Sequence, residues 1–522
     1  MKAILLGAIA TLMLGAPALA QVTTAAVTGG QVQGTAVDGI GVFKGIPFAA
    51  PPVGDLRWRQ PQPVKAWTGV RPATAFAPGC MQSSFMSMGP ANYSEDCLYL
   101  NVWTPAKSAS EKLPVMVWIY GGGFTAGQTA IPAYDGTSLA RKGVIMVSIA
   151  YRLGALGFLA HPELSRESGK GSGAYGLADE IAGLRWVRDN IARFGGDPRN
   201  VTVFGESAGG MSVSMLAASP PARGLFAKAI SESGGSFGPP KSANEGGSTV
   251  PTLKAAEATG QRAFAALGAP DLKAARALPA DRVAQAQGQF WPVADGEFIL
   301  GDQYELYEQG RFNDTPVLIG TNADEGRLFA GLGGPPPADP AAAFAQQVRG
   351  AYGDKVDSVI AAYTTAPADP AKASKNLMRD STFAWHTWAW ARLQSEKGRG
   401  RAYVYYFENK KPSQPDGATH ADELGYVFGS GPMGIAPGAP SPPKTAVDDV
   451  LIGQFQGYWT NFAKTGDPNG PGLPTWPAFT RASPQVMNIA PTRPLAGPPN
   501  MAELKALDDY FAWRRRQPPA GG

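Results

Sequence analysis

One serine in a glycine-rich pentapeptide has the surroundings of a nucleophile. Residues 205–209 read Gly-Glu-Ser-Ala-Gly, the G-x-S-x-G pattern in which a sharp strand-to-helix turn exposes the hydroxyl of the central serine, here Ser207. Residues 201–204 are typical of a buried strand, and residues 211–218 of a helix. The glycines would remove steric clashes at the turn, and the helix would point its free N–H groups at the hydroxyl. A glycine-rich loop without chemistry is the alternative, so we looked for a base, an acid and an oxyanion hole.

A second glycine run has the composition of an oxyanion hole. Residues 115–119 are apolar throughout, as in a strand covered on both faces. Tyr-Gly-Gly-Gly-Phe follows at positions 120–124, where several backbone N–H groups can converge on one point because no side chain intervenes. The run matches the HGGG-type loop, with tyrosine replacing histidine. The N–H of Ala208, directly after Ser207, would add a donor. A flexible turn is the alternative interpretation.

The general base must be one of only three histidines. His420 is the best placed, because it lies in a polar loop after a predicted strand at residues 403–407, where a neutral imidazole can accept a proton. His161 precedes a proline, and we expect a structural role for it. His386 lies among aromatic residues, so we expect it to pack in a helix or to line a pocket wall.

The orienting acid should lie between the serine and the histidine in the chain order of this type of site. Asp324 and Glu325 directly follow a predicted strand at residues 317–320. Local sequence geometry does not choose between these two carboxylates.

Alternating strand and helix signals indicate an α/β fold with a mostly parallel central sheet and helices on both faces. Residues 27–48 alternate short β-like runs with glycine turns, which is typical of an antiparallel sheet edge. Two helical blocks, at residues 233–295 and from about residue 338 to residue 398, are expected to be insertions that roof the site at the carboxyl side of the sheet. The strands are predicted at residues 98–103, 114–120, 144–150, 201–204, 317–320 and 403–407, and a further helix at residues 184–194.

Residues 1–20 have the features of a cleaved signal peptide. Lys2 gives a positive start, residues 4–14 are apolar, and Ala-Leu-Ala at positions 18–20 suits a cleavage site. A membrane anchor is the less favoured alternative, and no later segment is long and apolar enough to span a bilayer. We therefore expect a soluble protein that is secreted or periplasmic. Cys80 and Cys97, the two cysteines of this exported chain, are predicted to form one disulfide.

Composition excludes several classes of function. A formal net charge of +4 on 522 residues gives no basis for nucleic-acid binding. Three scattered histidines and two cysteines offer no metal site, and we expect no cofactor. The basic run at residues 514–516 is expected to be a solvated tail or a helix end. Length alone suggests two to four domains, but the candidate residues span positions 121–420 and must share one site, which favours a single domain over residues 21–522.

Further motifs lie along nearly the whole mature chain. They are Phe-Lys-Gly-Ile-Pro-Phe-Ala at 43–49, Glu-Asp-Cys-Leu-Tyr-Leu-Asn at 95–101, Gly-Gly-Gly-Phe at 121–124, Tyr-Arg-Leu-Gly at 151–154, the run 195–210, Asp-Glu-Gly at 324–326, and His420 with Glu423-Leu424. In this combination the chain resembles the type-B carboxylesterase and cholinesterase family of α/β-hydrolases.

The resemblance assigns roles that local patterns leave open. It implies that Glu325 is the acid, and that Gly122, Gly123 and Ala208 are the oxyanion donors. It also matches Cys80 and Cys97 to the first disulfide of the family. It implies two structural ion pairs without catalytic roles, Arg57 with Glu95 and Arg152 with Asp179. Glu206, beside the nucleophile, either orders water or tunes the field at His420, or is only a buried, hydrogen-bonded acid.

The resemblance implies a serine carboxylic-ester hydrolase that works through an acyl-enzyme on a small-molecule ester. Cholinesterases carry a tryptophan in the first disulfide loop, whereas this chain has Phe85 and Tyr93 there, so a choline ester is not expected. Small residues at positions 284–288, before Trp291, suggest space for a large acyl group. Hydrolysis of an amide, lactone or carbamate remains an alternative, and a non-catalytic binding protein is disfavoured because all three triad residues are present.

Overall fold

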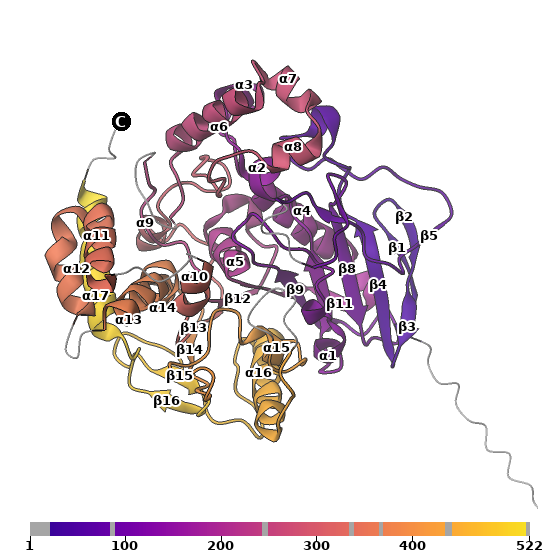
Figure 1. The fold of residues 1–522 in the computed structure, drawn as a ribbon. Helices are drawn as coiled ribbons and strands as arrows, with labels where there is room; N and C mark the ends of the chain where they lie inside the picture. The colour runs from indigo at the N-terminus through magenta and orange to yellow at the C-terminus, as the bar shows by residue number, and fades with distance from the viewer. Residues whose placement is uncertain are drawn as a thin grey trace, which may run out of the picture.

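A mixed, mostly parallel β-sheet forms the centre of the molecule (Figure 1). The computed structural model describes residues 21–83, 89–242, 249–332, 339–364, 369–433 and 441–517, so the predicted signal peptide at residues 1–20 lies outside the described residues, as does Phe85. Within them the sheet has eleven strands in the order β3-β4-β8-β10-β9-β11-β12-β13-β14-β15-β16. Their bounds are β3 Thr35–Val37, β4 Ile40–Pro47, β8 Tyr99–Thr104, β9 Leu113–Ile119, β10 Ile145–Ile149, β11 Gly196–Glu206, β12 Lys228–Glu232, β13 Val317–Asn322, β14 Ala402–Phe407, β15 Val486–Ile489 and β16 Arg493–Leu495.

The strands from β10 to β15 in this order are parallel. Antiparallel pairs complete both ends, through β8 on one side and β16 on the other. Residues 115–119 and 145–149 are fully buried, as expected for parallel strands covered on both faces. The predicted α/β class and mostly parallel sheet are therefore confirmed.

Helices cover both faces of the sheet (Figure 1). On one face, Gly183 of α4 lies so close to Ile149 of β10 that a Cβ there would be 2.7 Å from that side chain. On the other face, Trp459 of α16 packs against Tyr405 of β14. The covering helices are α4 Tyr175–Asn190, α5 Ala208–Ala218 and α14 Trp385–Lys397 on the first face, and α1 Thr137–Ala140, α15 Leu424–Val427 and α16 Ala446–Thr465 on the second.

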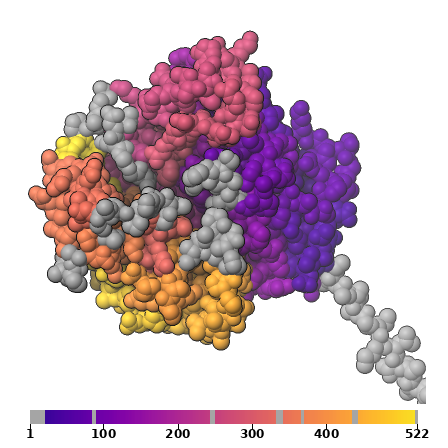
Figure 2. All heavy atoms as spheres, in the orientation of Figure 1, coloured from indigo at the N-terminus to yellow at the C-terminus, as the bar shows by residue number. Residues whose placement is uncertain are grey.

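Two helical insertions follow β12 and β13, as predicted. In the view of Figure 2 these insertions, in pink and orange, and the indigo N-terminal part border the centre of one face. Among the described residues no helix combines the length and apolar character that a bilayer crossing requires. The first insertion holds α6 Leu253–Leu267, α7 Leu272–Ala277, α8 Ala280–Ala284 and α9 Gln303–Glu308, and the second holds α10 Gly326–Leu332, α11 Pro340–Tyr352, α12 Val356–Tyr363, α13 Pro370–Arg379 and a π-helical segment Asp380–Ala384 that leads into α14.

Smaller elements lie outside the main sheet. A three-stranded sheet of β1, β2 and β5 and a short pair of β6 with β7 belong to the N-terminal part. Two short helices precede α4. Their bounds are β1 Thr24–Val27, β2 Gly30–Gln33, β5 Val70–Pro72, β6 Gly79–Cys80, β7 Tyr93–Ser94, α2 Gly154–Phe158 and α3 Pro162–Ser168.

The basic run near the carboxyl end belongs to helix α17 (Met501–Arg516). Its central residue, Arg515, is not solvated. Its guanidinium pairs with Asp302 at 2.7 Å, donates to the carbonyl oxygen of Phe237, and lies 4.0 Å from the ring centroid of Tyr304. The expectation of a helix end is confirmed, but this arginine ties the helix to the first insertion.

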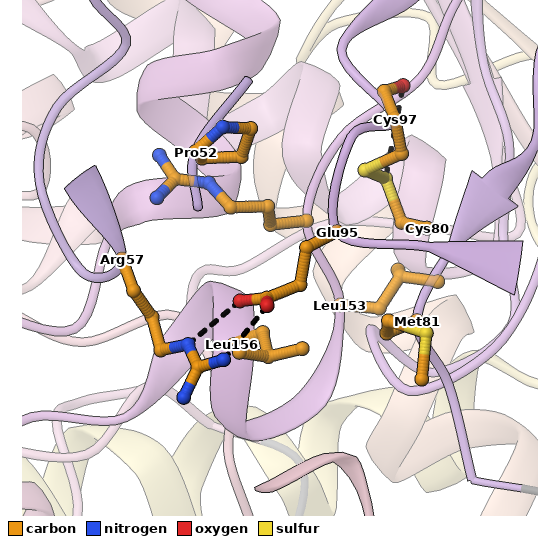
Figure 3. Close-up of a pocket in the computed structure, with 9 residues that line it drawn as sticks. Pro52, Arg57, Cys80, Met81, Glu95, Cys97, Leu153 and Leu156 are labelled. Carbon is orange, nitrogen blue, oxygen red and sulfur yellow. Dashed lines mark hydrogen bonds and ion pairs between the residues drawn. A yellow bond between two sulfur atoms is a disulfide. The ribbon is translucent and has the colours of Figure 1, made fainter. Parts of the chain in front are cut away.

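The predicted disulfide joins Cys80 and Cys97, both buried. Two ion pairs that the resemblance implied are present as well. Glu95 accepts two hydrogen bonds from Arg57, each 2.7 Å long, beside the disulfide (Figure 3). Asp179 accepts from Arg152 with both carboxylate oxygens, at 2.8 Å.

Candidate active site

Ser207 lies on a strained turn between β11 and α5. Its φ of 54° and ψ of −123° are a conformation that residues with a side chain rarely adopt. The turn is held by a hydrogen bond from the Ser207 N–H to the Glu232 carbonyl oxygen, 2.9 Å long. A Cβ on Gly209 would lie 2.0 Å from the Ile119 carbonyl oxygen. Only glycine fits at position 209, and the tight turn leaves the hydroxyl free of the helix.

The loop after β14 brings His420 to this hydroxyl. Asp422 fixes the loop by accepting a hydrogen bond from the Thr419 N–H at 2.8 Å. Nε2 of His420 lies 2.9 Å from Oγ of Ser207, although 213 residues separate the two. The serine hydroxyl can therefore donate its proton to the imidazole.

Glu325, rather than Asp324, faces the histidine. Its Oε2 lies 2.6 Å from Nδ1 of His420. Its Oε1 accepts from the hydroxyl of Ser233 at 2.6 Å and from the N–H of Asn322 at 2.7 Å, so three hydrogen bonds hold the fully buried carboxylate. Asp324 instead lies 3.5 Å from the ammonium of Lys375.

Two aromatic rings cover the imidazole. Phe383 is stacked on His420 with ring centroids 4.6 Å apart, and Phe329 lies 5.1 Å away. Phe383 belongs to the π-helical segment, a type of helical distortion that is frequent at functional sites. Sequence reasoning missed both rings and Ser233. A run of aromatic residues near position 383 was visible, but no pattern connected it with a histidine 37 residues further along the chain.

Glu206 brings a second carboxylate to His420. Its Oε1 lies 3.2 Å from Nε2 of His420 and makes no hydrogen bond. Burial raises the pKa of Glu206, the charge of His420 opposes this rise, and the charge of Glu325 adds to it. Burial lowers the pKa of His420, but the carboxylates of Glu206 and Glu325 outweigh this and raise it above its ordinary value. The site therefore favours the imidazolium form.

Two further acids lie beneath the site. Glu232 is the register partner of Glu206 on the adjacent strand, and its Oε1 accepts from the indole N–H of Trp459 at 2.8 Å. Burial, opposed by this bond and aided by the charge of Glu206, raises the pKa of Glu232 to about 8. Burial also raises the pKa of Glu423, as do the nearby glutamates Glu206, Glu232 and Glu325. Both acids are therefore harder to ionise than a carboxyl group in water.

The glycine loop lies against Ser207. A Cβ on Gly121 would be 3.0 Å from Cβ of Ser207. The Gly122 carbonyl oxygen accepts from the N–H groups of Thr125 and Ala126, which folds the loop back on itself. Among the described residues, no hydrogen bond occupies the N–H of Gly122, Gly123 or Ala208. These N–H groups can therefore donate hydrogen bonds to a ligand oxygen.

The other two histidines do not reach the site. His161 accepts from the N–H of Glu163 at the start of α3. His386 accepts from the N–H of Phe237, and burial lowers its pKa to about 4. The structural roles predicted for both agree with these contacts. No group of His, Cys, Asp or Glu within the described ranges could hold a metal ion.

Comparison with known proteins gives the family. The sequence model described as "Carboxylesterase family" matches residues 19–505. The chain belongs to the carboxylesterase family. Its sequence is 39% identical over 481 residues to the fumonisin B1 esterase of Sphingopyxis macrogoltabida, covering 87% of this chain and 84% of that protein. It is 38% identical over 466 residues to the para-nitrobenzyl esterase of Bacillus subtilis (strain 168), covering 86% and 91%.

Solved structures of the family agree with this fold. A PNB esterase structure superposes with a TM-score of 0.79 at 34% identity, covering 93% of this chain and 99% of that chain. A further relative is the medium-chain fatty acyl-CoA hydrolase precursor of Anas platyrhynchos, 36% identical over 501 residues and covering 87% of this chain and 85% of that protein. This carboxylesterase is a serine carboxylic-ester hydrolase with the α/β-hydrolase fold.

Proposed function

We propose that Ser207, His420 and Glu325 form the catalytic triad of this esterase. One observation carries the proposal. An unbroken chain of contacts runs from the serine hydroxyl through both ring nitrogens of the histidine to a buried carboxylate, with distances of 2.9 and 2.6 Å. Both distances lie within the reach that proton transfer requires.

The reaction proceeds through an acyl-enzyme. His420 takes the proton from Ser207 as Oγ attacks the ester carbonyl carbon, and Glu325 stabilises the imidazolium that forms. The imidazolium then protonates the departing alkoxide, which leaves as the alcohol. Water attacks the acyl-enzyme with His420 again as the base, and the carboxylic acid product leaves.

The backbone donors of Gly122, Gly123 and Ala208 stabilise the tetrahedral oxyanion. Their support is the position of the glycine loop against Ser207 and the availability of these N–H groups. Such donors act most strongly where charge develops away from water. Glu206 tunes the base, because its carboxylate lies 3.2 Å from His420.

The substrate is a small carboxylic ester with a bulky acyl group. The relatives are named for fumonisin B1, para-nitrobenzyl and medium-chain fatty acyl-CoA substrates, which differ widely in size. In this chain, residues 284–288 read Ala-Gln-Ala-Gln-Gly, of which three are small, and they precede Trp291. Trp291 packs on Phe124 of the glycine loop with ring centroids 4.8 Å apart. No tryptophan lies between Cys80 and Cys97, which disfavours choline esters.

Removal of the nucleophile tests the proposal. Ser207→Ala should lower kcat on p-nitrophenyl esters by about 10⁴-fold or more. Ser214→Ala, two turns further along α5, should keep wild-type kcat, because among the described residues the Ser214 hydroxyl bonds only within the helix and toward Gln303. Substantial activity in Ser207→Ala would refute the triad. Faster turnover of acetyl esters than of bulky acyl esters would refute the spacious acyl site.

We also propose that the protein is exported and that it folds as a single catalytic domain. The buried disulfide is typical of an oxidising compartment, which supports a secreted or periplasmic location and cleavage of residues 1–20. One sheet contains strands from residue 35 to residue 495, which supports a single domain over residues 21–522.

A further inference from the structure

One glutamine connects the disulfide to the glycine loop. The Gln82 amide donates from Nε2 to the Gly127 carbonyl oxygen at 3.0 Å and accepts at Oε1 from the Gly127 N–H at 3.1 Å. The same Nε2 lies 3.2 Å from the carbonyl oxygen of Cys80, two residues earlier. The Gln82 side chain is buried, with 7% exposed. It therefore pairs with both backbone groups of Gly127 as a neighbouring strand would.

Gly127 in turn packs against the start of the glycine loop. A Cβ on Gly127 would be 2.6 Å from the ring of Tyr120 and 2.7 Å from the carbonyl oxygen of Gly121. Gly127 is therefore packed closely against both residues, and a displacement of Gly127 toward them must move Tyr120 or Gly121. Gly122 and Gly123 directly follow Gly121 in the chain. The contact between Gly127 and Gly121 therefore lies next to their N–H groups and holds the two ends of the loop together.

A second contact joins the same two segments. Nε2 of Gln128 donates to the carbonyl oxygen of Pro90 at 2.9 Å. A Cβ on Gly79, directly before Cys80, would lie 3.0 Å from the side chain of Gln128. The segment closed by the disulfide therefore contacts residues 127 and 128 at two places, through Gln82 and through Pro90.

The disulfide itself is attached to rigid structure. One residue separates Cys97 from the start of β8. Figure 3 shows the disulfide beside the Arg57–Glu95 ion pair and Leu153. Arg57 also donates to the carbonyl oxygens of Ala275 and Leu278 in the first insertion. The covalent bond therefore gives Gln82 a fixed reference point close to the central sheet.

We propose that Gln82 is a positioning residue for the oxyanion hole, and that the Cys80–Cys97 disulfide supports catalysis through it. The inference rests on the proposed roles of Gly122 and Gly123. Gln82 touches no reacting atom, and it holds the donors where the oxyanion develops. Since loss of one donor costs about 10²- to 10³-fold in kcat, a displaced loop should cost about 10- to 100-fold.

The test is Gln82→Met, which keeps the length of the side chain and removes both hydrogen bonds to Gly127. The matched control is Gln62→Met, because the exposed Gln62 amide bonds only to the carbonyl oxygen of Gln60. With a p-nitrophenyl ester we expect kcat and kcat/KM of Gln82→Met to fall by the same factor. The affinity for an aryl trifluoromethyl ketone, which adds to the serine and forms an oxyanion, should fall by that factor too, while the pH midpoint of the acidic limb stays unchanged.

Some results would overturn the inference. One is a kcat of Gln82→Met within about twofold of wild type, because a displaced donor should reduce kcat by more than this. The other is a lower kcat of Gln82→Met with unchanged affinity for the ketone. Inactive Ser207→Ala together with fully active Gln82→Met would refute only the role of Gln82. Active Ser207→Ala would refute the proposed function instead.

Hydrogen exchange provides a readout that is independent of activity. In Gln82→Met, and in the Cys80→Ser/Cys97→Ser double variant, peptides covering residues 121–128 should exchange faster than in wild type. The triple variant that combines Gln82→Met with the loss of the disulfide should exchange little faster, and lose little more kcat, than Gln82→Met or the double variant does, because all of these changes act on one linkage. If Gln82→Met does not fold, Gln82→Glu keeps the acceptor for the Gly127 N–H but places a carboxylate oxygen against the carbonyl oxygens of Gly127 and Cys80, and it should lower kcat as well. Wild-type exchange in the folded variants, or fully additive losses, would contradict the linkage.

Discussion

Replacing Glu206 by glutamine removes a charge beside His420, the proposed base, and keeps the size of the side chain. The carboxylate lies 3.2 Å from Nε2 of His420. Two unit charges at this separation attract by about 5 kcal/mol at an effective dielectric constant of about 20. Single opposite charges in such positions shift measured pKa values by about one to three units, and we take this smaller effect as the expectation.

The sign of the effect follows from the two forms of the imidazole. Carboxylates favour the imidazolium and so raise the pKa of His420, whereas burial lowers it. The base must be neutral to accept the serine proton, so activity appears as pH rises through this pKa. Removing Glu206 lowers the pKa of His420. The acidic limb of the kcat/KM profile should therefore move to lower pH by about one to three units.

Initial rates on a p-nitrophenyl ester across the acidic limb measure this shift. Glu232→Gln is the control, because Glu232 is a buried acid on the adjacent strand whose Oε1 accepts from the indole N–H of Trp459. We expect a smaller shift for Glu232→Gln. A wild-type midpoint in Glu206→Gln, or a midpoint at higher pH, would refute the electrostatic reasoning.

Three further replacements test the turn, the buried ion pair and the support of the acid. Gly209→Ala should prevent folding or lower Tm, because its Cβ would lie 2.0 Å from a backbone oxygen; Gly453→Ala, with open space around its Cβ, should not lower Tm. Arg152→Met leaves the Asp179 carboxylate buried alone, and we expect the free energy of unfolding in urea to fall by about 3–5 kcal/mol. Ser233→Ala removes one of two donors to Glu325 Oε1 and should lower kcat about tenfold with KM little changed; an unchanged kcat would mean that the N–H of Asn322 suffices.

The local motifs predicted the parts of the site that local geometry determines. Ser207 needs a strand, a tight turn and a helix in sequence, so its pentapeptide and flanks were sufficient to find it. The order of strands then brings the three candidate side chains to one edge, which no local pattern states. The choice of Glu325 over Asp324 required the family resemblance, because adjacent residues on a loop differ only in which way they face. The catalytic roles themselves remain predictions.

The sequence patterns did not predict strand β12, and there is a physical reason for this. It carries Lys228 and Glu232 at its ends and reads as polar, yet it is fully paired between β11 and β13. Buried charges at strand ends hide the apolar pattern on which strand prediction depends. Ser233, which directly follows this strand and supports Glu325, was missed with it.

Helix α17, near the carboxyl end of the chain, stabilises a segment close to the site. Its Arg515 binds the carbonyl oxygen of Phe237, whose N–H is held by His386, and Phe237 lies only four residues beyond Ser233. Shortening the protein before Arg515 would therefore loosen a segment that begins at the support of Glu325. For purification, an affinity tag should extend the chain at this end, and helix α17 should be kept whole.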